Sequence, residues 1–173
     1  MANNEGKVFE EQFRRSVPDY VILHRLRDSS QSFSGGKLSK FSVKNPFDYI
    51  LWDSKAHILY ALELKSTKSD RIQFERKGDR KRNGIHWHQI DALNKWNQFD
   101  GVIGGIIIEF RQIGKVIFIH IDDFNKLSDT IDSVGFRISD LEEHNIPYTI
   151  IDRRFAKTKY KYDIDKFLTN SSI

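Results

Sequence analysis

Apolar residues follow two different spacings along this chain of 173 residues. Over residues 6–16 they recur every three to four positions, which predicts an amphipathic helix that Pro18 ends. Continuous runs of β-branched and aromatic residues instead predict buried strands at residues 20–24, 102–110 and 116–121. The two spacings together predict a sheet with at least one helix packed against it.

Residues 46–67 contain two apolar runs separated by a polar turn at residues 53–57, which is the pattern of a β-hairpin. Charged residues interrupt both runs where a buried strand would carry none. Alternate side chains of a strand point to opposite faces, so Glu63 and Lys65 share one face while the neighbouring leucines supply the other. The hairpin can bring Asp48 alongside them. The sequence therefore predicts two carboxylates and one ammonium group on one patch, in preference to a hairpin with charges on its solvated side.

The remaining elements follow from the same patterns. A second helix is expected over residues 85–98, and short helices are expected to start at Asp122 and at Ser139, where Ser139 begins a capping box. The paired glycines Gly104 and Gly105 lie inside a predicted strand and indicate close approach of another backbone. The order of elements predicts an α/β (α+β) fold with a mixed central β-sheet flanked by helices.

Two polar segments fall outside these elements. Residues 28–45 are rich in Ser, Gly and Lys, which indicates a long loop or a protruding hairpin, with residues 29–44 as a stalk or loop insertion. Residues 153–166 alternate basic and aromatic side chains. That pattern fits either a frayed surface strand or a second nucleic-acid contact, and we favour the frayed strand.

Length and composition limit the class of protein. The length suits a single domain spanning residues 1–173. No apolar run approaches the roughly 20 residues that a membrane span requires, and the first residues lack the apolar segment of a signal peptide. We therefore expect a soluble protein of the cytoplasm with no membrane partner. The absence of cysteine excludes disulfides, thiolate nucleophiles and cysteine-bearing zinc sites.

Positive charge gathers in one segment of the chain. The formal net charge is +4, whereas the segment from Lys65 to Arg82 has eight basic and three acidic residues and sums to +5 by itself. A basic run that begins beside candidate metal-binding carboxylates predicts contact with a phosphate backbone. The residues expected to contact DNA are Lys68, Arg71, Arg76, Lys77, Arg80, Lys81 and Arg82.

The two carboxylates and the lysine predicted on the hairpin are the groups that metal-dependent phosphate hydrolysis requires. Two carboxylates can hold one or two Mg²⁺ ions against a scissile phosphate, and a lysine beside them can orient or deprotonate the attacking water. This is the arrangement of the PD-(D/E)XK nucleases, with Asp48 and Glu63 as metal ligands and Lys65 as the catalytic lysine. His86 and His88 are also close in sequence, but a spacing of two places them on different faces of a helix. Structural or phosphate-facing roles are expected for these two histidines.

The same residues belong to a series of motifs that resembles the RecU-type Holliday junction resolvases of low-GC Gram-positive bacteria and their phages. The similarity runs in blocks from Gly6 to about Ile146. A Glu-x-Lys pair alone is common, whereas the full series in this order is specific. The blocks are Gly6-Lys7-Val8-Phe9-Glu10, Asp48-Tyr49, Glu63-Leu64-Lys65-Ser66-Thr67, His86-Trp87-His88-Gln89-Ile90, Gly104-Gly105-Ile106 and residues 138–146.

The resemblance implies a homodimeric enzyme, dependent on Mg²⁺ with Mn²⁺ as an alternative, that cuts two symmetric strands of a four-way DNA junction in recombination and repair. It implies a restriction-endonuclease-like sheet and a cytoplasmic location in a bacterium, or in the bacterial host of a phage. It also implies two further catalytic residues, with Glu10 completing the site from a helix and Gln89 positioning the water or a phosphate. Taken alone, Gln89 fits equally well with plain solvation on a helix surface.

One part of the family pattern has no counterpart in this sequence. In the family, a stalk before the Asp-Tyr pair is thought to enter the junction, but residues 29–44 match no family motif. Two alternatives therefore stay open: another PD-(D/E)XK nuclease, such as a restriction-type or flap-cleaving enzyme, and a non-catalytic DNA-binding module. The intact Asp48, Glu63 and Lys65 argue against the last alternative, because a degenerate site usually loses a carboxylate first.

Overall fold

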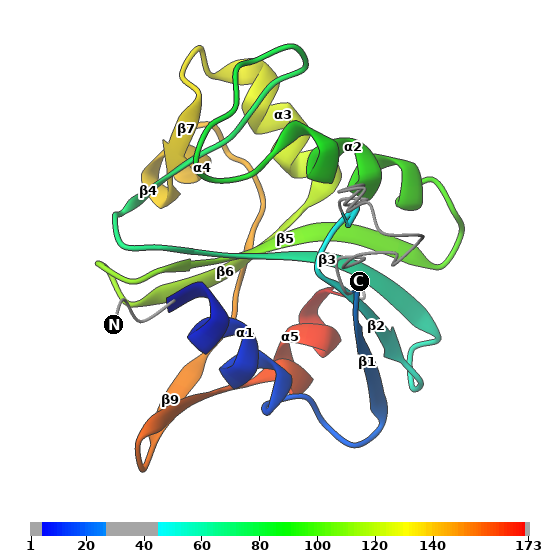
Figure 1. Ribbon diagram of the computed structural model, residues 1–173. Helices are drawn as coiled ribbons and strands as arrows, with labels where there is room; N and C mark the ends of the chain where they lie inside the picture. The colour runs from blue at the N-terminus through cyan, green and yellow to red at the C-terminus, as the bar shows by residue number, and fades with distance from the viewer. Residues whose placement is uncertain (1–4, 27–44, 172–173) are drawn as a thin grey trace, which may run out of the picture.

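Helices cover both faces of a six-stranded mixed sheet in the computed structural model, which describes residues 5–26 and 45–171 (Figure 1). The arrangement confirms the predicted mixed sheet flanked by helices. The sheet has the order β1-β2-β3-β5-β6-β8, formed by β1 (Val21–Arg25), β2 (Tyr49–Asp53), β3 (Ile58–Thr67), β5 (Val102–Phe110), β6 (Lys115–His120) and β8 (Thr149–Ile150). The helices are α1 (Glu5–Arg14), α2 (Trp87–Trp96), α3 (Ile121–Thr130), α4 (Ile138–Glu143) and α5 (Ile164–Ser171).

The chain builds this sheet from a meander and one crossover. β1, β2 and β3 are successive antiparallel neighbours, with Tyr49 opposite Leu62 in the second pair. The chain then leaves the sheet, forms α2 and returns as β5, which lies parallel to β3. β6 pairs antiparallel with β5, and β8 pairs antiparallel with β6. The β2–β3 pairing confirms the hairpin predicted for residues 46–67.

Side-chain alternation along β3 and β5 separates two apolar cores. Ala61 and Ile106 belong to the core that α2 and α3 complete, whereas Leu62 and Ile107 belong to the core that α1 and α5 complete. Figure 1 shows these two pairs of helices on opposite sides of the sheet. Glu63 has the same parity as Ala61, so it points toward α2, where an apolar side chain would otherwise pack.

The glycine pair in β5 has no room for side chains. A Cβ atom at Gly104 would lie 2.8 Å from the carbonyl oxygen of Leu93 in α2, and one at Gly105 would overlap the ring of Phe118 in β6. The predicted close approach at this pair is confirmed. The absence of a side chain at Gly104 allows α2 to pack directly onto the sheet.

Two small antiparallel pairs of strands lie outside the main sheet. β4 (Arg71–Gln73) pairs with β7 (Gly135–Arg137), and β9 (Arg153–Ala156) pairs with β10 (Lys159–Tyr162). The basic and aromatic tail therefore forms a regular hairpin, and the expected frayed strand is wrong. α5 follows this hairpin and was not indicated by the sequence pattern.

The N-terminal cap of α4 is two residues earlier in the chain than predicted. β7 runs directly into this helix, so the cap residue is Arg137, whose backbone N–H donates to Asp140 Oδ2 at 2.7 Å. The assignment of Ser139 as the cap is therefore wrong, because the chain turns into the helix two residues earlier.

The expected insertion and the expected absence of a membrane span can be compared with the structure only over the described residues. The insertion expected at residues 29–44 lies outside the described residues. Within residues 5–26 and 45–171, no helix is both long enough and apolar enough to cross a membrane.

Candidate active site

Backbone hydrogen bonds fix Asp48 against β3. Asp48 directly precedes β2, and its N–H donates to the carbonyl oxygen of Leu62 at 3.1 Å. Its Oδ2 accepts the N–H of Leu64 at 2.9 Å. Because Leu64 lies between Glu63 and Lys65, the Asp48 carboxylate sits beside the charged pair, and the structure brings together the three residues that the hairpin pattern predicted.

Glu63 is almost completely buried at the centre of this group. Its side chain is 1% exposed, and its Oε1 lies 2.8 Å from Lys65 Nζ. The same oxygen accepts Nε2–H of Gln89 at 2.6 Å. Glu63 Oε2 is also buried, and it has no hydrogen-bond partner among the described residues. Because an unpaired buried carboxylate oxygen is costly, Oε2 is the strongest single indication that this site binds another group.

The two carboxylates influence each other. Burial, together with the nearby negative charge of Asp48, raises the pKa of Glu63 to about 8, although Lys65 acts in the opposite direction. A divalent cation held by both carboxylates would relieve their repulsion. Mg²⁺ prefers oxygen ligands and is commonly held by one or two carboxylates, with water and phosphate oxygens completing its shell. Asp48 and Glu63 fit such an ion, and no three His, Asp or Glu side chains in the described part of the chain form a larger cluster.

Glu10 approaches the same region from α1, on the other side of the sheet. Its Oε2 pairs with Arg25 Nη2 at 2.9 Å and accepts the hydroxyl of Tyr49 at 3.4 Å. Burial and the charge of Asp48 raise the pKa of Glu10, whereas Arg25 lowers it. Glu10 therefore lies close enough to Asp48 for the two negative charges to repel each other, while Arg25 forms an ion pair with the Glu10 carboxylate. Arg25 carries no motif signal, because its partner lies fifteen positions away on another element.

Gln89 is held at the start of α2 in a single orientation. It is buried, so plain solvation on the helix surface is excluded. Its Oε1 accepts the N–H of His86 at 2.9 Å, which leaves Nε2 to donate to Glu63. The amide thus connects the helix terminus to the buried carboxylate. A role in positioning water or phosphate stays a prediction.

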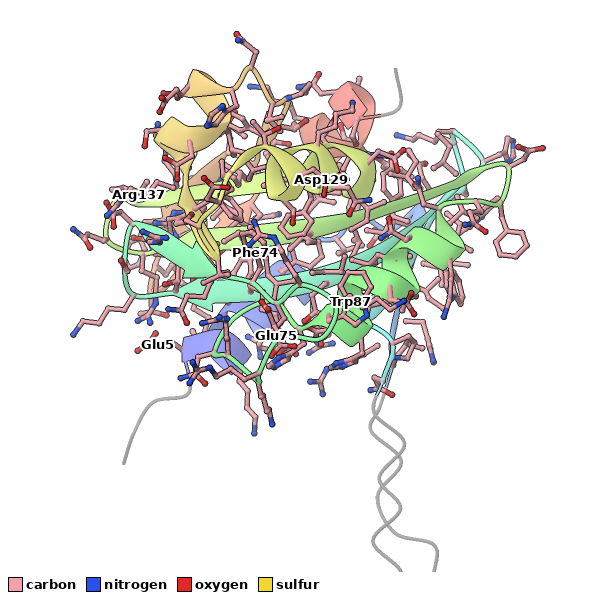
Figure 2. The ribbon with its side chains drawn as sticks, turned by 90° about the horizontal axis from the view of Figure 1, so that it is seen from above. Glu5, Phe74, Glu75, Trp87, Asp129 and Arg137 are labelled. Carbon is pink, nitrogen blue, oxygen red and sulfur yellow. The ribbon has the colours of Figure 1, made fainter. Side chains whose placement is uncertain are left out.

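Glu75 supports the start of α2, and Figure 2 shows it near Trp87. Its oxygens accept the backbone N–H groups of Arg82 at 2.8 Å and Trp87 at 3.0 Å, and Oε1 lies 2.8 Å from His86 Nδ1. Burial alone would raise its pKa, but these three hydrogen bonds lower the pKa of Glu75 to about 2. Glu75 therefore anchors both the basic loop and the helix that positions Gln89, a role that no sequence spacing indicated.

Replacing Glu75 with glutamine should lower the free energy of unfolding by roughly 2–3 kcal/mol at pH 7, because an amide keeps one acceptor oxygen where the carboxylate uses two. The low pKa means that the contribution of Glu75 is complete above about pH 4.5 and is lost as the pH falls toward 2. Urea unfolding at pH 7 and pH 3 should show a difference from wild type that shrinks at the lower pH. Glu143→Gln, at an exposed glutamate, is the control. An equal difference at both pH values would contradict this role.

The basic residues predicted to contact DNA divide into two groups. Arg76 donates to the carbonyl oxygens of Ser128, Ile131 and Ser133 at 2.8, 2.6 and 3.2 Å, near the end of α3. These bonds all use Nη2 and hold Arg76 against the end of α3, so Arg76 supports the fold, and its contact with DNA stays a prediction. Arg71 also donates to a backbone carbonyl, that of Gly135 at 3.0 Å, and Arg82 lies 3.7 Å from Asp79. The predicted residues whose side chains are exposed are Lys68, Lys77, Arg80 and Lys81.

Two hollows adjoin the predicted site, one at Asp48 and the other at Lys65, and basic side chains line both. One has a volume of 270 Å³ and is lined by Asp48, Lys81 and Gln89, among others. The other has a volume of 570 Å³ and is lined by Lys65 and Lys68, together with hydroxyl and amide side chains. A larger hollow of 740 Å³ lies elsewhere, between the end of α1 and the β9–β10 hairpin. The smaller hollows provide basic surface next to the predicted site, as binding of a phosphate backbone requires.

Comparison with known proteins gives two similarities. No protein-family model matches the chain. The chain is 37% identical over 125 residues to the SPbeta prophage-derived uncharacterized protein YotM of Bacillus subtilis strain 168, and the match covers 71% of this chain and 59% of YotM. In structure, it is similar to Hjc, a Holliday junction resolvase of Archaeoglobus fulgidus, with a TM-score of 0.44, 13% identity, and coverage of 80% of this chain and 89% of that chain. Neither similarity assigns a function to this chain.

Proposed function

We propose that this protein is a metal-dependent endodeoxyribonuclease of the PD-(D/E)XK type. The observation that supports this most directly is the buried Oε2 of Glu63, which has no hydrogen-bond partner among the described residues. The same carboxyl group is close enough to Asp48 for the charge of Asp48 to raise its pKa. A protein core that only needed packing would place an apolar residue at this position. A cation bound by both carboxylates explains why the charges are kept.

The residues around the carboxylates suit phosphodiester hydrolysis. Asp48 and Glu63 would hold Mg²⁺, or Mn²⁺ as an alternative, and the bound ion would stabilise negative charge on the phosphate and activate water. Lys65 can orient that water as a hydrogen-bond donor, because its ammonium group is partly exposed beside Glu63. Gln89 keeps Glu63 in place, and Glu10 of α1 adds negative charge near Asp48.

The finer proposal is a RecU-type resolvase that acts as a homodimer on branched DNA in recombination and repair, in the cytoplasm of a bacterium or of a phage host. The ordered motifs from Gly6 to about Ile146 support it, because a generic nuclease needs only the carboxylates and the lysine. A resolvase must cut two opposed strands, which requires two active sites related by a two-fold axis.

The test compares a four-way junction, a 5′-flap and a linear duplex of equal length in a gel assay with Mg²⁺. We expect paired symmetric nicks in the junction, faster than cleavage of either other substrate, and a dimer in sedimentation velocity. Equal or faster cutting of flap or duplex, or a monomeric protein, would favour another PD-(D/E)XK nuclease. Tight binding of all three substrates without cleavage of any would indicate a non-catalytic DNA-binding module.

A further inference from the structure

The β9–β10 hairpin presents two different faces that the proposed active site does not use. The hairpin lies on the α1 side of the sheet, opposite α2, and projects away from the body of the protein (Figure 1). Residues that pair directly across a hairpin share a face: Phe155 stands opposite Tyr160, and Arg154 stands opposite Lys161. One face of the hairpin is therefore aromatic and the other is cationic.

The base of the hairpin is anchored in the protein body. Tyr162 is buried and meets Phe9 of α1 edge to face, with ring centroids 5.6 Å apart. Arg153 pairs with buried Glu109 of β5 at 2.7 Å, and Glu109 also accepts the hydroxyl of Ser66 at 2.8 Å. These contacts hold the hairpin at a defined position, so its tip is presented from a fixed support.

The hairpin carries four cations, two of which, Arg154 and Lys161, line the 740 Å³ hollow together with Asp19, Asp152, Asp163 and Asp165. Within the described residues the four cations form no ion pair, whereas exposed lysines elsewhere, such as Lys95 and Lys126, are paired with aspartates at 2.6 and 2.7 Å. Like charges placed directly opposite each other, as at the Arg154–Lys161 pair, destabilise a hairpin. The arrangement is therefore better explained by an anionic ligand than by stability of the fold. The four cations are Arg154, Lys157, Lys159 and Lys161.

The aromatic face at the tip is open to solvent. Phe155 is 65% exposed, and Tyr160 is 37% exposed. Their rings meet edge to face at 5.3 Å, and the guanidinium of Arg153 lies 4.0 Å from the centroid of Tyr160. Tyr160 is thus braced by its neighbours, while Phe155 has a free surface. An exposed ring beside unpaired cations is the combination that binds a single strand, because unpaired bases stack on the ring and phosphates meet the cations.

We infer that the β9–β10 hairpin binds single-stranded nucleic acid, with a base stacked on Phe155 on one face and the strand passing over the edge of the hairpin, so that its phosphates meet the cations of the other face. A duplex would leave the aromatic face unused, because its base faces are already stacked. That the strand is DNA rests on the proposed function, since branched DNA can offer unpaired strand beside the duplex that is cut. The hairpin and the carboxylate pair lie on opposite faces of the sheet, so they would engage different segments of one branched molecule.

The experiment measures fluorescence anisotropy of labelled oligo-dT and oligo-U with the full-length protein in EDTA, so that binding is separated from cleavage. Phe155→Ala should weaken binding of oligo-dT roughly fivefold or more, the loss expected for one base stack. Lys159→Ala with Lys161→Ala should lower the slope of log affinity against log salt by about 0.7 for each cation that meets a phosphate. Arg153 and Tyr160 are left unchanged because they brace the hairpin.

Matched controls test whether any exposed ring or charge has the same effect. Phe99→Ala removes a ring that is 67% exposed at the end of α2, and Lys95→Ala with Lys126→Ala removes two exposed charges far from the hairpin in sequence. Both controls should bind as wild type does. Circular dichroism and thermal unfolding should show every variant folded, since none of the altered side chains is buried.

The outcomes separate this inference from the proposed function. Hairpin variants that bind both oligonucleotides as wild type does would overturn it, as would variants that lose binding only to anionic vesicles of phosphatidylserine and phosphatidylcholine. Weakened binding of oligo-U alone would support the site and reassign its ligand to RNA. If Mg²⁺ supports no cleavage but Phe155→Ala still weakens oligo-dT binding, the nuclease proposal fails and the hairpin site stands.

Discussion

Replacing Glu63 with glutamine is expected to lower Mg²⁺-dependent DNA cleavage by a factor on the order of 10³, which corresponds to roughly 4 kcal/mol of lost transition-state stabilisation. The amide has nearly the same shape as the carboxylate and can still accept the hydrogen bond from Gln89. It cannot supply a charged ligand to a cation. Cleavage of a labelled junction under single-turnover conditions measures the loss.

The fold should survive this substitution and gain stability relative to wild type as the pH rises from about 4.5 to about 8. Over this range buried Glu63 keeps its proton in the folded protein, because its pKa is raised from 4.5 to about 8, whereas the unfolded chain releases that proton and unfolding of wild type becomes easier. Glutamine does not ionise in either state. DNA binding should be unchanged or tighter, because a negative charge facing phosphate is removed. If Glu63→Gln unfolds the protein, Glu63 is a structural residue and the proposed site is wrong.

Asp48→Asn should cause a comparable loss of cleavage, and Asp53 offers a control on the same strand. Asp53 is also buried, but its Oδ1 accepts the N–H of Lys55 at 2.9 Å in the β2–β3 turn, at the far end of the strand. Asp53→Asn keeps that acceptor oxygen and should leave cleavage intact. Equal losses in the two variants would show that any buried aspartate of the hairpin is needed for folding.

Removal of divalent cations is expected to abolish cleavage completely, and addition of Mg²⁺ should restore it. The Lys65 ammonium is held 2.8 Å from Glu63, and a single ammonium group cannot stabilise the negative charge that develops on the phosphate without a cation. The assay compares junction cleavage after dialysis against EDTA with cleavage after Mg²⁺ is returned. Undiminished cutting in chelator would rule out the proposed chemistry.

A second measurement follows the ion without relying on activity. Mg²⁺ that binds the folded protein should raise its melting temperature in a concentration-dependent way. The rise should disappear in Glu63→Gln and persist in Asp53→Asn. A rise of equal size in both variants would place the bound ion elsewhere on the protein.

The strands and the charged hairpin were predictable because they depend on local pattern. Alternation alone places Glu63 and Lys65 on one face, and the short turn between the runs fixes which strand pairs with which. The strand at Val102–Phe110 was equally clear, since a strand buried on both faces is a continuous apolar run. The series of short segments after Phe124 was harder, because two- and three-residue strands such as β7 and β8 leave no periodicity to detect.

The supporting contacts of the site were not predictable from spacing. Gln89 reaches Glu63 only because α2 crosses above β3, and Arg25 meets Glu10 only because β1 ends beside α1. Charge composition was also insufficient in the basic segment. Arg76 looks like its basic neighbours in the sequence, yet it is bound by backbone carbonyls near the end of α3.

The glycine at position 104 has a consequence for how mutations would be tolerated. A methyl group there would press on the carbonyl of Leu93, one helical turn beyond Gln89, and would push α2 outward from the sheet. The 2.6 Å hydrogen bond between Gln89 and Glu63 depends on that spacing. If the site acts as proposed, a side chain at position 104 would impair catalysis, although Gly104 has no side chain with which to meet a substrate.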